Sequence, residues 1–278
     1  ANQRNLAKVT ISPFVTRIPN YLFNANKELT VLSLPNTLKT IGAYAFENCS
    51  KIAALNLGNQ LESIGDGAFL ECHAFTKIVL PETTKAVGAK AFKGCSSITE
   101  VTIGTQLKSI GEYAFDECRS FTALVLPKGF KDLGKGAFRN CIKLTVAQLG
   151  DSLKAVPEEA FRDCIALTEI NLPATVKTIG DKAFYNDSSL AVVTMREGLE
   201  RIGNQAFYNN AGVIHFSIPG TVESIGENCF MGCNSMIRLT FRKGEGVLTL
   251  SNKDCINSAG KYVDNDYFYD SPIRTLYV

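Results

Sequence analysis

The sequence of 278 residues has no tryptophan, only two histidines and three methionines, and a net charge of only +2. Its 29 basic and 27 acidic residues leave no cationic surplus for binding phosphates, which argues against nucleic acid as a partner. No apolar run approaches the roughly 18 residues that a membrane-spanning helix needs. The first residues lack the charged and apolar regions of a signal peptide, so the sequence leaves targeting open.

Recognisable catalytic motifs are also missing. The sequence has no H-E-x-x-H metal motif, no phosphate-binding loop, no G-x-S-x-G nucleophile motif and no carboxylate pair flanking an evident cleft. Cys229 and Cys233 have the spacing of half a zinc site, but no second pair of ligands has suitable spacing. We therefore expect no catalytic residues, no metal and no cofactor, in a protein that is not an enzyme.

What the sequence does have is a strict repeat of 23 residues. In each unit an aliphatic residue stands five positions before a phenylalanine, and glycine or proline follows that aliphatic residue directly. Alanine precedes most of the phenylalanines, and three further apolar columns follow six, nine and eleven positions after them. The phenylalanines are Phe23, Phe46, Phe69, Phe92, Phe115, Phe138, Phe161, Phe184, Phe207 and Phe230.

One such unit is too small to bury its own apolar face. Apolar residues at alternate positions, such as Val101 and Ile103, predict a short strand with one buried side. The stretch from the aliphatic residue to the phenylalanine predicts one tight helical turn. Stacking the units places the strands in a parallel sheet and the apolar columns in one core. We therefore expect an α/β solenoid about 50 Å long, from ten units at about 4.8 Å each.

These columns carry a family resemblance. The run from Leu107 to Cys118, followed by Phe121, Leu124 and Leu126, closely resembles the BspA-like leucine-rich repeat. The resemblance extends from about residue 6 to 241. It implies a curved leucine-rich-repeat solenoid with short parallel strands on the concave face and short helical turns on the opposite side. It also implies a bacterial or protist surface protein, in a family that includes adhesins binding extracellular-matrix proteins.

The repeat divides the chain into two parts. Residues 1–241 form the predicted solenoid, and the period then fails in a polar insertion rich in Gly, Asn and Ser. Tyr267 and Leu276 resume the spacing once, so 242–278 is predicted to be an irregular C-terminal unit. The apolar columns are already in register at Leu6, and we expect the natural chain to continue beyond both ends.

Most of the nine cysteines occupy one column, three positions after the phenylalanine. Neighbours in a parallel stack stand about 4.8 Å apart, beyond the usual 3.5–4.5 Å between the Cβ atoms of a disulfide. We therefore predict buried free thiols, with a redox or metal role as the alternative. Asp187 and Asn210 fill the same column, which suits a place where backbone N–H groups need an acceptor. The cysteines of the column are Cys49, Cys72, Cys95, Cys118, Cys141, Cys164 and Cys233.

Positions eight and ten after each phenylalanine form the predicted open face of the strands, which we call the strand face. Its side chains are small and polar or short and apolar, without the aromatic anchors typical of tight interfaces. The simplest interpretation is a solvated surface. The alternative hypothesis is a stripe of Glu169, His215 and Arg238 that contacts a partner. The candidate binding residues on this face are Lys77, Glu100, Glu169, His215 and Arg238.

The column directly after the phenylalanine changes character along the chain. Three successive units carry Tyr185, Tyr208 and Met231, side chains that are frequent in recognition patches, so they form a candidate exposed patch. The alternative is that these side chains lean over the turns of a less regular end. Earlier units carry Glu47, Lys93, Asp116, Arg139 and Arg162 at this position.

The favoured hypothesis is a non-catalytic, extracellular or cell-surface leucine-rich-repeat protein that mediates adhesion by binding a protein or glycan. The location follows from the family resemblance alone. One alternative is a structural spacer within a larger surface protein. Another is an intracellular scaffold, which the unpaired thiols favour mildly. The sequence specifies neither the ligand nor the oligomeric state.

Overall fold

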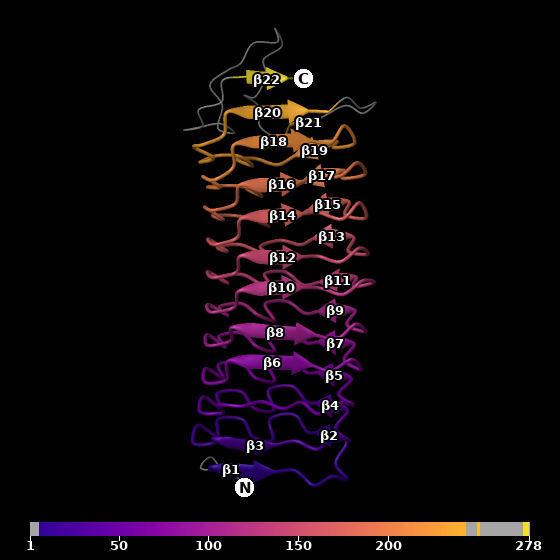
Figure 1. The fold of residues 1–278 in the computed structure, drawn as a ribbon, viewed down its shortest axis with the longest axis vertical. Helices are drawn as coiled ribbons and strands as arrows, with labels where there is room; N and C mark the ends of the chain where they lie inside the picture. Colours follow the sequence, from indigo (N-terminus) through magenta and orange to yellow (C-terminus); the bar gives the residue numbers. More distant parts are fainter. Residues whose placement is uncertain (1–5, 243–248, 251–274, 278) are drawn as a thin grey trace.

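The structure, a computed structural model, describes residues 6–242, 249–250 and 275–277. The 23-residue units stack in sequence order along the long axis of the molecule, as a solenoid of about ten turns (Figure 1). Most strands of the regular array pair in parallel with the equivalent residues one unit later, such as Val9 with Leu32, and the ladders are interrupted at a few units. The predicted solenoid of parallel strands with a 23-residue register is confirmed.

One side of the solenoid carries strands of three or four residues with alternating burial. In β6 (Lys77–Leu80), Ile78 and Leu80 are buried while Lys77 and Val79 are exposed. Their exposed side chains form the strand face. The other strands of this side are β1 (Lys8–Thr10), β3 (Val31–Ser33), β8 (Glu100–Ile103), β10 (Ala123–Val125), β12 (Val146–Gln148), β14 (Glu169–Asn171), β16 (Val192–Thr194), β18 (His215–Ile218), β20 (Arg238–Phe241) and β22 (Thr275–Tyr277).

A second set of parallel strands, each two residues long, contains the aliphatic column and was not predicted from the sequence. It forms a six-stranded ladder followed by a five-stranded one, beside the strands of the first set in Figure 1. These strands are β2 (Arg17–Ile18), β4 (Thr40–Ile41), β5 (Ser63–Ile64), β7 (Ala86–Val87), β9 (Ser109–Ile110), β11 (Asp132–Leu133), β13 (Ala155–Val156), β15 (Thr178–Ile179), β17 (Arg201–Ile202), β19 (Ser224–Ile225) and β21 (Thr249–Leu250).

The segment around each phenylalanine is a series of tight turns. The described residues contain no helix, so the predicted helical turns, and with them the α/β class, are wrong. In every unit the residues two before and two after the phenylalanine have positive φ, as at Tyr44 (53°) and Asn48 (59°). These left-handed residues interrupt the i to i−4 bonding of a helix. The Phe46 N–H instead donates to the Ala68 carbonyl of the next unit, while the Glu47 N–H donates to Tyr44.

The phenylalanine column forms a continuous stack of buried rings. Adjacent rings from Phe23 to Phe230 are nearly parallel, and the centroids of Phe69 and Phe92, for example, lie 5.4 Å apart with planes 2° from parallel. Aromatic burial of this kind contributes much of the stability of a core. The core therefore runs uninterrupted through the regular units and holds the strand face on a rigid support.

The glycine column has a packing cause. A Cβ added at Gly134 would lie 2.3 Å from the carbonyl carbon of Gly111 and 2.4 Å from the nitrogen of Glu112. The Gly134 N–H also donates to the carbonyl of Ile110 in the preceding unit. Because the neighbouring main chain fills the space, the close stacking of units at this corner requires a residue without a side chain.

Two strands extend the ladders beyond the regular array. β21 pairs with β19, and β22 pairs with β20 in the register Leu239 to Leu276. Most of the region 242–278, including Tyr267, lies outside the described residues, so its assignment as an irregular unit stays a prediction.

Candidate functional site

Exposed apolar side chains recur along the strand face, while Phe14, Tyr21 and Leu22 near the N-terminus are exposed outside it. Five valines of this face are 39–53% exposed, and Ile214 and Ile237, which directly precede β18 and β20, are about half exposed. Apolar groups gathered on one face of a folded protein commonly mark an interaction site. The five valines are Val31, Val79, Val125, Val146 and Val192.

The charged candidates of the strand face form two pairs and one separate residue. Lys77 and Glu100 are register partners on β6 and β8, and their Nζ and Oε1 atoms lie 2.8 Å apart. His215 and Arg238 are register partners on β18 and β20. Glu169 pairs instead with a valine of β16, which separates it from His215 along the column. Their role in binding stays a prediction.

At the His215 end of the face the positive charge comes from Arg238, the register partner of His215. Partial burial, and then the positive charge of Arg238, lower the pKa of His215. The Nε2 atom of His215 lies 3.1 Å from Oγ1 of Thr240. Within the described chain neither His215 nor Arg238 forms an ion pair with a carboxylate, whereas Lys77 is neutralised by Glu100. The two charged pairs therefore offer different chemistry to a partner.

The candidate patch of Tyr185, Tyr208 and Met231 is partly buried. The two tyrosine rings stack at 4.8 Å between centroids and 2° between planes, and the guanidinium of Arg162 lies 5.0 Å above Tyr185. Burial, reinforced by Tyr208, raises the pKa of Tyr185. The stacking fits the interpretation that these side chains cover the turns, and their role in recognition stays a prediction.

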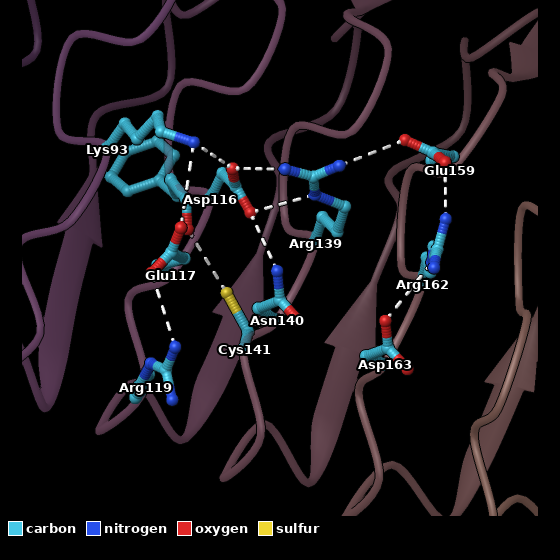
Figure 2. A network of polar contacts seen from close by, with 11 residues as sticks. Lys93, Asp116, Glu117, Arg119, Arg139, Asn140, Cys141, Glu159, Arg162 and Asp163 are labelled. Atoms are coloured by element: carbon cyan, nitrogen blue, oxygen red, sulfur yellow. Dashed lines mark hydrogen bonds and ion pairs between the residues drawn. The ribbon is translucent and has the colours of Figure 1, made fainter.

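The earlier units of the same column hold a network of charges that the sequence did not predict (Figure 2). Asp116 is fully buried, and its carboxylate accepts hydrogen bonds from Lys93 Nζ at 2.6 Å and from Arg139 Nε and Nη2 at 3.1 and 2.9 Å. Asn140 donates a further bond at 3.2 Å. Burial disfavours the charge of Asp116, but the bonds from Arg139 and Lys93 outweigh it and hold its pKa below the usual value.

The network continues along the stack. Arg139 Nη1 lies 3.3 Å from Glu159, and Arg162 makes ion pairs with Glu159 at 2.7 Å and with Asp163 at 3.1 Å. Figure 2 shows these side chains pointing toward one another from successive units. The acidic and basic groups neutralise one another, so the network joins the units and leaves few free donors or acceptors for a ligand.

The cysteine column is a ladder of free thiols. The eight cysteines of the described chain are unpaired and buried, which confirms the prediction for them, while Cys255 lies outside the described residues. Each thiol of the column donates to the phenylalanine carbonyl of the preceding unit, as Cys72 does to Phe46 with 3.0 Å between Sγ and O. Burial raises the pKa of Cys49 to about 11 and that of Cys233 to about 12. These thiols are therefore poor nucleophiles at neutral pH.

Asp187 and Asn210 serve as acceptors within this column, as predicted. Oδ1 of Asp187 accepts the Cys164 N–H at 2.8 Å, and Oδ1 of Asn210 accepts the Asp187 N–H at 3.0 Å. Both residues are fully buried.

The described residues contain no group of three or more His, Cys, Asp or Glu residues that could hold a metal ion. The same part of the chain includes no helix long and apolar enough to cross a membrane.

Several solved structures share this architecture. A leucine rich cell surface protein of Faecalibacterium prausnitzii is 20% identical, with a TM-score of 0.52 over 98% of this chain and 83% of that protein. A leucine-rich repeat protein of Eubacterium ventriosum is 18% identical, with a TM-score of 0.54 over 82% of each chain. The pneumococcal vaccine antigen PcpA is 19% identical, with a TM-score of 0.50 over 98% of this chain and 84% of that protein. At these identities the likeness concerns the fold alone.

A comparison with curated proteins finds no match. The model of the BspA type leucine rich repeat region, in six copies, matches residues 1–121 and again residues 108–237. Together these two matches span well over half of the sequence, and the chain therefore belongs to the BspA type leucine rich repeat family.

Proposed function

We propose that this chain is a non-catalytic binding module of a cell-surface or extracellular protein, and that its strand face docks a protein or glycan in adhesion. The observation that carries the proposal is the group of exposed valines on that face, from Val31 to Val192. Exposed apolar area on a rigid repeated surface favours association, because a partner that covers it removes that area from water.

The contrast with the other charged surface supports the choice of this face. Around Asp116 each charged group already has a partner, whereas the strand face offers uncovered valines and the positive charge of Arg238 beside His215. A ligand gains most where it satisfies groups that the protein itself leaves unsatisfied.

Two observations support a surface location. The chain belongs to a repeat family whose resemblance suggested a surface protein, and one structural neighbour is described as a cell surface protein. Both observations concern the location of related proteins. The test for this chain is to localise the natural full-length protein by surface proteolysis of intact cells.

The binding test uses the purified chain on a panel of extracellular-matrix proteins and a glycan array. The double variant Val125→Asp/Val146→Asp introduces charge at the centre of the strand face. Ile165→Asp, at an apolar residue that is 40% exposed outside the strand face, is the matched control. We expect the double variant to lose at least tenfold in affinity and the control to bind normally. Retention of no ligand, or equal binding by the double variant, would contradict the proposal.

A structural spacer is the second candidate, favoured by the uninterrupted stack of phenylalanine rings from Phe23 to Phe230. A continuous core makes the array a stiff rod, which suits a stalk that holds another domain away from a surface. Loss of cell adhesion when the array is shortened by one unit, with no ligand bound by the array itself, would favour this function.

A further inference from the structure

The thiol ladder follows one rule along the column. Where the next unit has a cysteine in the column, the phenylalanine carbonyl accepts two hydrogen bonds. One comes from the backbone N–H three residues later, and the other comes from the cysteine thiol of the next unit. The carbonyl of Phe138, for example, accepts the Cys141 N–H and the Cys164 thiol, at 3.3 and 3.1 Å. The next carbonyl, of Phe161, accepts the Cys164 N–H at 3.1 Å, but the residue at the following thiol position is Asp187. The donor of the ladder is therefore replaced by a carboxyl group.

This carboxyl group is buried and only half satisfied. Asp187 has no exposed surface, Oδ1 accepts the Cys164 N–H, and Oδ2 has no hydrogen-bond partner. The groups around it are the thiol of Cys164, the amide of Asn210 and the acidic Asp163, with no base among them. A buried carboxylate without a cation is costly, and the usual response is to bind a proton.

We propose that Asp187 is held inside the solenoid as a neutral carboxylic acid, and that its acidic proton forms a hydrogen bond across the joint between its unit and the preceding one. The proton turns Oδ2 into a hydroxyl donor, and the Phe161 carbonyl stands where the other units have the acceptor of the thiol. Burial and the negative charge of Asp163 both raise the pKa of Asp187, in agreement with this state. Loss of the proton leaves a negative charge in the core on a carboxyl group whose Oδ2 has no hydrogen-bond donor.

The joint then depends on pH in a defined direction. The unfolded chain releases this proton near pH 3.9, whereas the folded chain keeps it to higher pH. The contribution of Asp187 to stability is complete below the unfolded pKa and is lost as the pH rises through the folded pKa. The contact between the units of Asp187 and Cys164 therefore weakens as the pH rises.

The substitution Asp187→Asn tests the proposal, because an amide has the shape of the protonated acid but does not titrate. Urea unfolding is measured from pH 4 to 8 for the wild type, for Asp187→Asn, and for Asp132→Asn as an exposed control on β11. Relative to Asp187→Asn, the unfolding equilibrium constant of the wild type should rise about tenfold per pH unit until the folded carboxyl titrates. The control should follow the wild type.

A carboxyl ¹³C NMR titration of the folded protein gives the protonation state directly, with Asp187→Asn identifying the signal. We expect the Asp187 signal to have the chemical shift of a protonated acid well above pH 4. An ionised signal at pH 5, or unfolding curves for the wild type and Asp187→Asn that stay parallel from pH 4 to 8, would overturn the proposal.

Discussion

The strand face and the charge network around Asp116 belong to the same solenoid, but their side chains are partnered differently. In the network, residues of successive units bond one another, and even the fully buried Asp116 receives donors from Lys93, Arg139 and Asn140. On the strand face, valines stay exposed and His215 and Arg238 have no carboxylate partner within the described residues. The network therefore joins the units to one another, whereas the strand face, our proposed binding surface, keeps its side chains exposed.

The largest expected effect comes from breaking the network. Arg139→Met removes two of the bonds to the buried Asp116 and should cost about 3 kcal/mol, since a buried charge loses its main partner. Urea unfolding measures this loss, and ligand binding should be unchanged. Lys143→Met, at an exposed site three residues after Asn140, is the control and should stay within about 0.5 kcal/mol. Equal stability of the two variants would show that the network contributes little.

The decrease in folding stability at acidic pH gives a second test of the charge network. Because the pKa of Asp116 is held below its usual value, its contribution to stability is present above the unfolded pKa of about 3.9 and is lost as the pH falls through the folded pKa. Asp116→Asn should therefore lose less stability than the wild type between pH 5 and pH 2. A wild-type acid limb as flat as that of Asp116→Asn would contradict the ionised state of Asp116.

A smaller effect is expected in the thiol ladder. Cys141→Ala removes a buried sulfur and one weak hydrogen bond, at a cost of about 1 kcal/mol by urea unfolding. Thiol titration is the companion measurement. The eight described cysteines should be unreactive in the native protein, and all nine of the sequence should react after denaturation. Fewer than nine would show that a disulfide exists.

The smallest change in stability is expected on the strand face. The pair Lys77 and Glu100 is exposed, so Lys77→Ala should change the free energy of unfolding by less than about 0.5 kcal/mol. The same holds for alanine at Glu169, His215 and Arg238, which tests the proposed stripe through binding alone. A strand-face variant that unfolds like Arg139→Met would remove the distinction between the two surfaces.

Much of the fold could be predicted from the sequence, because each column has one physical role in every unit. The 23-residue register, the phenylalanine core and the unpaired thiols all follow from spacing and from the strand separation. The helical turn was wrong because hydrophobic spacing does not report φ. A signal for the left-handed residues was present two positions after the phenylalanine, where most units carry Asn, Asp or Gly, which tolerate positive φ. These residues are Asn48, Gly94, Asn140, Asp163, Asn186, Asn209 and Gly232.

The charge network was missed for a different reason. Lysine, aspartate and arginine are residue types usually found at the surface. The burial of Asp116 depends on its contacts with Lys93 and Arg139 in the two neighbouring units. The alternating sign of charge down one column was the available signal, because side chains one strand spacing apart are in contact. On the strand face the sequence supplied the positions but not which charges neutralise one another, since that depends on side-chain geometry.

The most direct test of the account is the binding comparison between the two surfaces. The wild type, Val125→Asp/Val146→Asp and Arg139→Met are measured against the matrix protein or glycan that the wild type retains, at a temperature where all three are folded. We predict that the strand-face variant loses at least tenfold in affinity while Arg139→Met binds like the wild type. Unchanged binding by the strand-face variant, with loss in Arg139→Met, would contradict the assignment of the binding surface.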